Sequence, residues 1–384
     1  MDFSLTEDQQ LLVENLKELL ARIMPPEKQE EYQNAGTFPW AEWKELAECG
    51  FVGVGWPEEL GGTPADMMTQ MLVNLTISRM GGMLGAYFTL GMTTVYDVVE
   101  FGTKEQKEKY AIPFVQGGAP LSLAVSEPST GSDVASMQTS YKKDGDYFII
   151  NGTKHYTTGA AESKAIIVMA KDAKVKNVHA AGTMFIVDTD TPGLSINKLH
   201  KFSHETGATS ICECFFKDVR VHKSAILGRE HRGFMQTMSN FARERLANVS
   251  GSLATAINAF EDACTYANQR VQFGQTIGNF QLIQEMIMEM ACRIENMYNM
   301  ICKLCWKIDQ GMDIRIEQGM AKYYCARATF EVVDMATQVL CGIGVVGDHR
   351  VGRYFTDARV GRIAGGTDQV MIFNTVPEIL KKYK

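Results

Sequence analysis

Two polar, glycine-bounded stretches decide how this chain is organised: Ala124–Asp133 (AVSEPSTGSD) and Asn151–Gly159 (NGTKHYTTG). The first is the end of a strand that enters a loop rich in hydroxyl and amide donors. The second is a turn that returns to a strand with an aromatic residue at its centre. Both suit a flat ligand with a polar edge, although ordinary turn chemistry explains either stretch equally well when it is taken alone.

The two stretches lie in a β-rich section between two helical sections. Helical patterns fill the first third, beginning with a capping box formed by Thr6 and Gln9. Further helices are expected at about 41–49, 67–80, 86–99 and 102–110. Short β-rich runs then follow at about 121–125, 147–150, 165–169, 182–187 and 212–219, and long helical stripes at about 235–265, 278–310, 314–341 and 368–381.

This order predicts an α+β multidomain fold. We expect an N-terminal all-α domain over residues 1–118 and a middle antiparallel β-barrel or sandwich domain over 119–227. A C-terminal four-helix bundle is expected over 228–384.

Composition excludes several classes of function. The 384 residues, 45% of them hydrophobic, fit a globular protein of two or three folding units. A formal net charge of -7 leaves no basic field for nucleic acid or an anionic membrane surface. The N-terminus resembles no secretion signal, and no apolar run approaches the roughly 18 residues of a membrane span. We therefore expect a cytoplasmic protein that neither binds nucleic acid nor inserts into a membrane.

Two patterns resemble binding motifs by their letters alone. The segment Gly342–Gly347 (GIGVVG) matches the dinucleotide fingerprint, but a helical pattern precedes it where the fingerprint requires a strand. We interpret it as a glycine-rich turn between helices. Cys302 and Cys305 have helical apolar periodicity around them and no second Cys pair, so we expect a buried helix face and no metal site.

Six segments, in order, resemble the acyl-CoA dehydrogenase family over essentially the whole chain. They are residues 57–62 (PEELGG), 126–133 (SEPSTGSD), 216–221 (FKDVRV), 228–234 (GREHRGF), 270–274 (RVQFG) and 357–367 (DARVGRIAGGT). The resemblance implies FAD as cofactor and an acyl-CoA or enoyl-CoA as substrate.

The resemblance also implies roles for the two opening stretches. Val125 and Ser126 correspond to the segment that hydrogen-bonds the pyrimidine edge of the flavin, with Ser126 where the family usually has Thr. Tyr156 takes the place of a ring, more often Trp, that covers one flavin face. Thr158 corresponds to the residue that reaches flavin N5, and Ser132 to a serine near the bound thioester.

A second group of residues resembles a cofactor site shared between subunits. The segment that reaches the FAD diphosphate and adenosine of a neighbouring subunit corresponds to Arg270, Gln272, Phe273 and Gln281, and its complement to Gln338, Val339 and Gly342. Thr367 and Gln369 complete the expected FAD-binding set. A shared site implies at least a dimer, and we expect a tetramer built as a dimer of dimers. An electron transfer flavoprotein is the expected redox partner.

The catalytic base departs from the commonest family pattern. Many relatives carry a Glu in a Tyr-Glu-Gly-Thr motif, whereas this chain has Ala364–Thr367 (AGGT). A second subset carries the base on a helix, in a segment that ends Glu-Arg-Leu, which corresponds to Glu244 here. By itself, a Glu between two Arg on a helix is more often a solvated ion-pair face; the vacant loop position favours catalysis. Arg245 would support the site electrostatically, Gly365 would offer its N–H to the thioester oxygen, and Phe241 would contact substrate.

The substrate and the direction of reaction stay open at this stage. The segments 259–263, 266–274, 280–284 and 365–368 resemble bacterial crotonobetainyl-CoA reductases most, which implies crotonobetainyl-CoA or γ-butyrobetainyl-CoA. The alternative is another short, branched or aryl-propenoyl-CoA. Tyr87, Phe88 and Tyr96 offer rings for a quaternary ammonium group, although helix packing explains them better. An acyl-CoA oxidase and a non-catalytic flavoprotein subunit are further alternatives.

Overall fold

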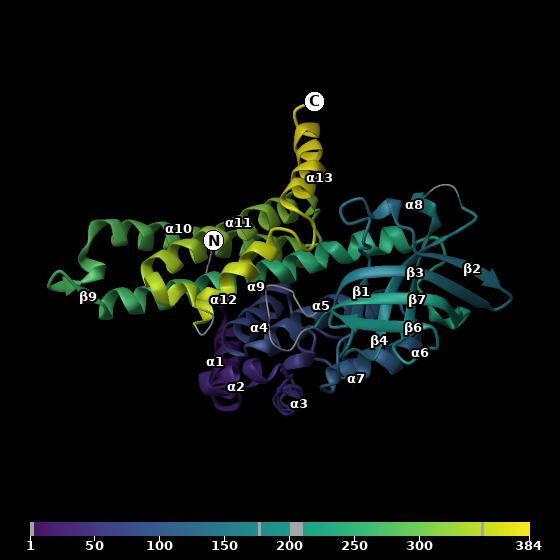
Figure 1. Ribbon diagram of the computed structural model, residues 1–384, viewed down its shortest axis with the longest axis horizontal. Helices are drawn as coiled ribbons and strands as arrows, with labels where there is room; N and C mark the ends of the chain where they lie inside the picture. Colours follow the sequence, from purple (N-terminus) through teal and green to yellow (C-terminus); the bar gives the residue numbers. More distant parts are fainter. Residues whose placement is uncertain (1–3, 176–177, 200–209, 347–348) are drawn as a thin grey trace.

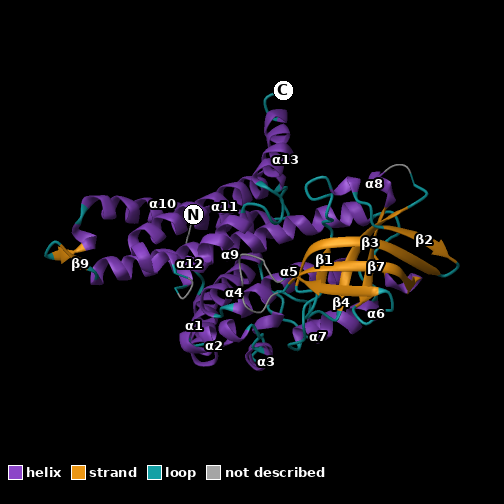
Figure 2. Cartoon of the chain, viewed as in Figure 1, coloured by secondary structure: helices purple, strands orange, loops and turns teal. Residues whose placement is uncertain are grey.

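The computed structural model describes residues 4–175, 178–199, 210–346 and 349–384. A long helical bundle runs along the molecule, with the β domain at one end and the N-terminal helices along one side (Figure 1). The strands gather in that single domain, apart from a small hairpin at the opposite end of the bundle (Figure 2). The predicted order of helical, β and helical parts is therefore confirmed.

Between Glu7 and Val115 the named elements of the N-terminal part are all helices or helical turns. Its main helices are α1 (Glu7–Ile23), α2 (Pro26–Ala35), α3 (Trp40–Glu48), α4 (Met67–Met80) and α5 (Met83–Phe101). Shorter turns are η1 (Phe51–Gly53), η2 (Glu58–Leu60), α6 (Lys104–Gln106), the π-helical η3 (Lys107–Ala111) and α7 (Ile112–Val115). The predicted capping box begins α1, since Thr6 Oγ1 accepts from the Gln9 N–H and Gln9 Oε1 accepts from the Thr6 N–H.

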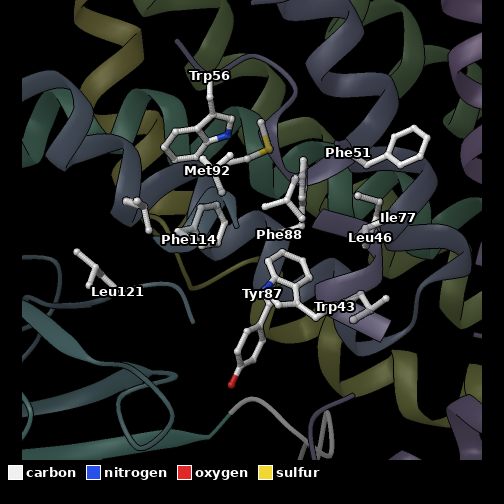
Figure 3. Packing of buried hydrophobic residues seen from close by; sticks show 14 of the residues in the cluster. Trp43, Leu46, Phe51, Trp56, Ile77, Tyr87, Phe88, Met92, Phe114 and Leu121 are labelled. Atoms are coloured by element: carbon white, nitrogen blue, oxygen red, sulfur yellow. The ribbon is translucent and has the colours of Figure 1, made fainter. Parts of the chain in front are cut away.

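Large aromatic residues hold this part together (Figure 3). The Trp56 and Trp43 rings lie 5.4 Å and 5.8 Å from the ring of Phe114, and all three are buried. Helix α5 fits against them because Gly91 has no side chain: a Cβ there would lie 1.9 Å from the Phe114 ring. Tyr87 is likewise buried and stacks on Phe38 with ring centroids 3.7 Å apart. These contacts fix α5 between the N-terminal core and the rest of the molecule.

The middle part is an eight-stranded sheet. Its strands are β1 (Ser122–Ala124), β2 (Ser140–Asp144), β3 (Tyr147–Thr158), β4 (Ala165–Asp172), β5 (Gly182–Asp188), β6 (Leu194–Lys198), β7 (Ile211–His222) and β8 (Ile226–Leu227). The order is β6-β7-β3-β2-β4-β5-β8, with β1 beside β4. Pairings are antiparallel except those of β4 with β1 and β2. The short elements η4 (Val134–Ser136), α8 (Val178–Ala181) and η5 (Lys223–Ala225) connect the strands.

The C-terminal part is the bundle. It consists of α9 (Gly233–Gln269), α10 (Gln281–Asp309), α11 (Arg315–Leu340) and α12 (Arg350–Gly361), followed by α13 (Asp368–Lys381). The hairpin β9 (Val271–Gln272) and β10 (Gln275–Thr276), with η6 (Ile277–Asn279), joins α9 to α10. Helix α12, which sequence analysis did not predict, completes the bundle. Helix α13 packs its first half against the start of α11 and then projects from the body (Figure 1).

The glycine-rich segment and the Cys302–Cys305 pair both lie in the helical bundle. Helix α11 leads directly into η7 (Cys341–Val345), which contains Gly342, so the fingerprint letters follow a helix; Gly347 lies outside the described residues. Cys302 and Cys305 lie on α10, with Cys305 fully buried, and all nine cysteines are free thiols. Within the described residues, one segment, Arg315–Val345, is long and apolar enough to cross a membrane. It consists of the bundle helix α11 and the turn η7, and core helices of folded domains pass the same test.

Candidate active site

Glu244 lies on α9 and faces the turn between α12 and α13. A Cβ placed on Gly365 would lie 3.5 Å from Glu244 Oε1 and 2.9 Å from Asn248 Nδ2. Asn248 is one helical turn after Glu244, so both side chains leave the same face of α9. The carboxylate therefore lies against the backbone of the turn at Gly365, the position at which the family resemblance implies a base in many relatives.

Two glycines in left-handed conformation give the turn its shape. Gly365 has φ +66° and Gly366 has φ +103°, values that residues with a Cβ rarely adopt. Arg245 donates from Nε to the Gly365 carbonyl oxygen over 3.3 Å, which fixes the turn against α9. Thr367 then caps α13 by accepting from the Val370 N–H. The two glycines of the AGGT sequence thus allow this sharp turn, and position 365 has no side chain and therefore no carboxylate.

Burial and nearby cations act on Glu244 in opposite directions. Although part of the side chain reaches solvent, desolvation by surrounding protein raises the pKa of the carboxyl above its usual range. The positive charges of Lys322 and Arg245, and a hydrogen bond with Asn248, partly offset this rise. A carboxylate with a raised pKa is a stronger base than an exposed one, which suits proton abstraction from carbon.

Lys322 is a charged residue of this site that sequence analysis missed. It lies on α11, is 3% exposed, and has its Cε 3.6 Å from the same point beside Gly365. Its ammonium group donates to the carbonyl of Gly361 at the end of α12. The sequence did contain a sign of this burial: Lys322 lies on the apolar face of a core helix, three residues before the buried Cys325.

The two stretches that opened the sequence analysis are joined by a buried ion pair. Lys154 Nζ donates to Glu127 Oε1 and to the Val125 carbonyl, both over 2.9 Å. Glu127 also accepts from the Thr139 N–H over 2.9 Å. The His155 N–H donates to the carbonyl of Ser126 over 2.9 Å. The loop after β1 is thus pinned to the centre of β3.

Tyr156 is presented at this junction by an irregular strand. The register of β3 against β7 shifts between Lys154 and Thr157, and Tyr156 takes φ 57°. The residue is 57% exposed, and its ring stacks on that of His155 with ring centroids 4.0 Å apart. A non-glycine residue held at positive φ inside a strand is a feature often associated with binding sites. Thr158 follows, paired with Ile211 of β7.

The remaining predicted residues lie in five places. Ser132 is exposed in the loop before η4, Phe241 is half-buried on α9, and Gln369 is exposed on the first turn of α13. The segment Arg270–Gln281 surrounds the hairpin at the far end of the bundle, remote from β3 (Figure 1). There Phe273 is 95% exposed with φ 51°. At the end of α11, Gln338 is exposed, Val339 buried and Gly342 exposed. Within a single chain, the hairpin residues therefore lie far from Tyr156.

The junction of Val125, Ser126 and Tyr156 presents a polar edge beside an exposed aromatic ring. A backbone loop fixed by a buried ion pair offers polar atoms, and an exposed aromatic ring beside it offers a stacking surface. These features and the carboxylate on α9 define a class of protein: a three-part oxidoreductase that acts on CH–CH groups with FAD.

The comparisons identify the family. Acyl-CoA dehydrogenase models match the N-terminal domain over residues 6–118, the middle domain over 122–219 and the C-terminal domain over 231–377. The chain therefore belongs to the acyl-CoA dehydrogenase family.

Similarity to individual relatives extends over the whole chain. The chain is 40% identical to the probable acyl-CoA dehydrogenase YdiO of Escherichia coli (strain K12), over 100% of both chains. Among solved structures, the acyl-CoA dehydrogenase from Geobacillus kaustophilus matches with a TM-score of 0.93 and 27% identity, covering 99% of this chain and 100% of that one. Butyryl-CoA dehydrogenase from Megasphaera elsdenii gives 0.91 and 27%, with the same coverage.

Proposed function

We propose that this protein removes or adds hydrogen across the Cα–Cβ bond of a short acyl-CoA thioester, with Glu244 as the base. The observation that carries the proposal is the position of the Glu244 carboxylate, 3.5 Å from where a side chain on Gly365 would begin. This places a helix-borne carboxylate where many relatives use a carboxylate from the turn. The raised pKa of Glu244 supports the same role.

The proposed chemistry divides between this carboxylate and the turn. Glu244 takes the α-proton of the thioester, and the Gly365 N–H stabilises negative charge on the thioester oxygen. Bound FAD supplies a hydride acceptor for Cβ. Arg245 fixes the turn and adds positive charge beside the developing enolate. In the reverse direction, protonated Glu244 returns the proton to Cα.

The proposed cofactor site is shared between subunits. Val125, Ser126, Tyr156 and Thr158 would hold the flavin, near Ser132. Because the hairpin lies at the far end of the bundle, Arg270, Gln272, Phe273 and Gln281 would reach the FAD of another subunit, and Gln338, Val339 and Gly342 would form the complementary piece of that shared site. Thr367 and Gln369 complete the proposed FAD-binding set. We accordingly propose a dimer-based tetramer, a cytoplasmic location and an electron transfer flavoprotein as redox partner.

The acyl group is proposed to be short. γ-Butyrobetainyl-CoA and crotonobetainyl-CoA are the specific candidates, and another short, branched or aryl-propenoyl-CoA is the alternative. The suggested aromatic residues do not favour a quaternary ammonium group: Tyr87 and Phe88 are buried in the core, and the Arg243 guanidinium covers the Tyr96 ring at 3.3 Å. Anaerobic flavin bleaching by butyryl-CoA, γ-butyrobetainyl-CoA, isobutyryl-CoA and phenylpropionyl-CoA, with reoxidation by the matching enoyl-CoA esters, would identify the substrate and the direction.

The role of Glu244 is tested by Glu244→Gln. We expect retained FAD and assembly, with bleaching slowed on the order of 10³-fold or more, because the amide cannot accept the proton. Glu261→Gln is the matched control, since Glu261 lies on the same helix but pairs with Arg79 at the surface. A near-normal rate in Glu244→Gln would overturn the proposal.

The pH dependence provides a second test. Glu244 must be ionised to accept a proton, so the bleaching rate should fall as the pH drops through its raised pKa. This acid limb should be absent from the residual rate of Glu244→Gln. Its persistence there would assign the titration to another group.

A further inference from the structure

We propose that Lys322 is a positioning residue for Glu244, which holds the turn that carries Gly365 against α9 and supplies a buried positive charge that keeps the carboxylate ionised. This inference rests on the proposed role of Glu244 as the base. It adds a residue from α11, a helix that contributes no other member to the catalytic group described above.

Lys322 reaches the turn between α12 and α13 from helix α11. Its Cε lies 3.6 Å from the point beside Gly365 that is 3.5 Å from Glu244 Oε1, so lysine and carboxylate flank one small space. Three residues earlier, Gly319 lets α13 approach closely: a Cβ there would lie 1.9 Å from Thr375 Oγ1. With α13 packed closely on α11, the turn that precedes α13 lies against Lys322, which contacts it at Gly361 and beside Gly365.

Two cations hold the turn at its two ends. Lys322 donates to the carbonyl of Gly361, the last residue of α12, where the helix leaves its terminal carbonyls without helical partners. Arg245 donates to the carbonyl of Gly365 from α9. Removing either cation should loosen the turn at that end, and with it the Gly365 N–H and the contact with Glu244.

The charges around Glu244 and Lys322 come from three helices. Arg245 on α9 acts on both groups, and Asp368 on α13, which is paired with Arg362 over 2.7 Å, acts on Lys322 of α11. The Asp368 carboxylate therefore already has its own cation. Burial lowers the pKa of Lys322 to about 8, and the negative charges of Glu244 and Asp368 oppose that decrease, while Arg245 adds to it. At neutral pH the lysine is thus largely protonated and offsets the desolvation of Glu244.

The test measures the pH profile of anaerobic flavin bleaching by the acyl-CoA that reacts fastest in the substrate panel. In Lys322→Met the acid limb should move to higher pH, with a rate about tenfold lower on that limb, where one pKa unit corresponds to a factor of ten. Lys322→Arg should move the limb back toward that of the wild type. A lysine that merely caps α12 would change the rate at all pH values alike.

Lys307→Met is the matched control. Lys307 is a mostly buried bundle lysine that pairs with Glu317 over 2.5 Å, and its loss should leave the acid limb in place. If Glu244→Gln stays active, the proposed function fails. If Glu244→Gln is inactive while Lys322→Met keeps the wild-type acid limb, the inference about Lys322 alone is overturned.

A measurement on the protein without bound cofactor separates folding from chemistry. Urea unfolding of the wild type, Lys322→Met, Glu244→Gln and the double variant forms a double-mutant cycle. We expect the second substitution to cost clearly less after the first, because the charges of Glu244 and Lys322 stabilise each other and the first substitution already removes that interaction. Strict additivity would show that the two groups do not interact and would overturn the inference.

Discussion

Breaking the buried ion pair between Lys154 and Glu127 should destabilise the β domain strongly. The Lys154 side chain is fully buried and that of Glu127 nearly so. Lys154→Met removes two hydrogen bonds and leaves a carboxylate that still accepts from the Gln138 and Thr139 N–H groups but lacks a countercharge. Breaking such a pair costs about 3–5 kcal/mol, and we expect a loss in that range.

The cost should depend on pH in a defined direction. Burial alone would raise the pKa of Glu127, but Lys154 and the hydrogen bonds hold it below its usual range. The stabilisation is therefore complete above the unfolded pKa of about 4.3 and is lost as the pH falls through the folded value. In Lys154→Met, Glu127 lacks its countercharge and becomes protonated, and so neutral, as the pH falls. The difference in free energy of unfolding between wild type and Lys154→Met should therefore shrink in acid.

Urea unfolding at pH 7 and at pH 4 measures both effects. Lys154→Met/Glu127→Gln should recover at least half of the loss, because the Gln oxygen can still accept from one N–H without carrying charge. Lys223→Met is the control, since its partner Asp146 is exposed on the same domain, and little change is expected. A free energy of unfolding for Lys154→Met within about 1 kcal/mol of wild type at pH 7 would refute the reasoning.

Three further predictions concern packing, the shared cofactor site and the turn. Gly91→Ala should lower Tm and reduce the free energy of unfolding by about 1–3 kcal/mol or more, because the new Cβ meets the buried Phe114 ring. Thermal unfolding followed by circular dichroism measures this, and an unchanged Tm would contradict it. Phe273→Asp should release FAD on gel filtration while leaving urea unfolding unchanged, because Phe273 is 95% exposed on its own chain; full retention of FAD would argue against its predicted contact with a second subunit. Glu244→Gly/Gly365→Glu should bleach on the order of tenfold faster than Glu244→Gly, because the new side chain would begin 3.5 Å from where Glu244 Oε1 lies. The Asn248 side chain, 2.9 Å from the new Cβ, must shift, and the positive φ of position 365 adds strain. Equal rates would show that a carboxylate from this position does not reach Cα.

Much of the fold could be read from local patterns. Apolar periodicity located α4 at 67–80 and α13 at 368–381, and in the structure the N-cap residues Asp66 and Thr367 begin these helices. The short strands β2 and β6 were missed because most of their residues are exposed and give no apolar alternation. Helix α12 was missed as well, since only Val351 and Ala358 are buried along it.

The candidate site shows the same division. The sequence by itself determined that position 365 carries no carboxylate and that Glu244 is available on a helix, since both facts concern residue identity. Only the tertiary structure decided that the two positions meet, because α9 and the turn are separated by more than a hundred residues and their approach depends on packing in the bundle. The same holds for Lys322 and Lys154: burial turns an ordinary lysine into a charge that acts on one partner, and burial is a property of the packed molecule.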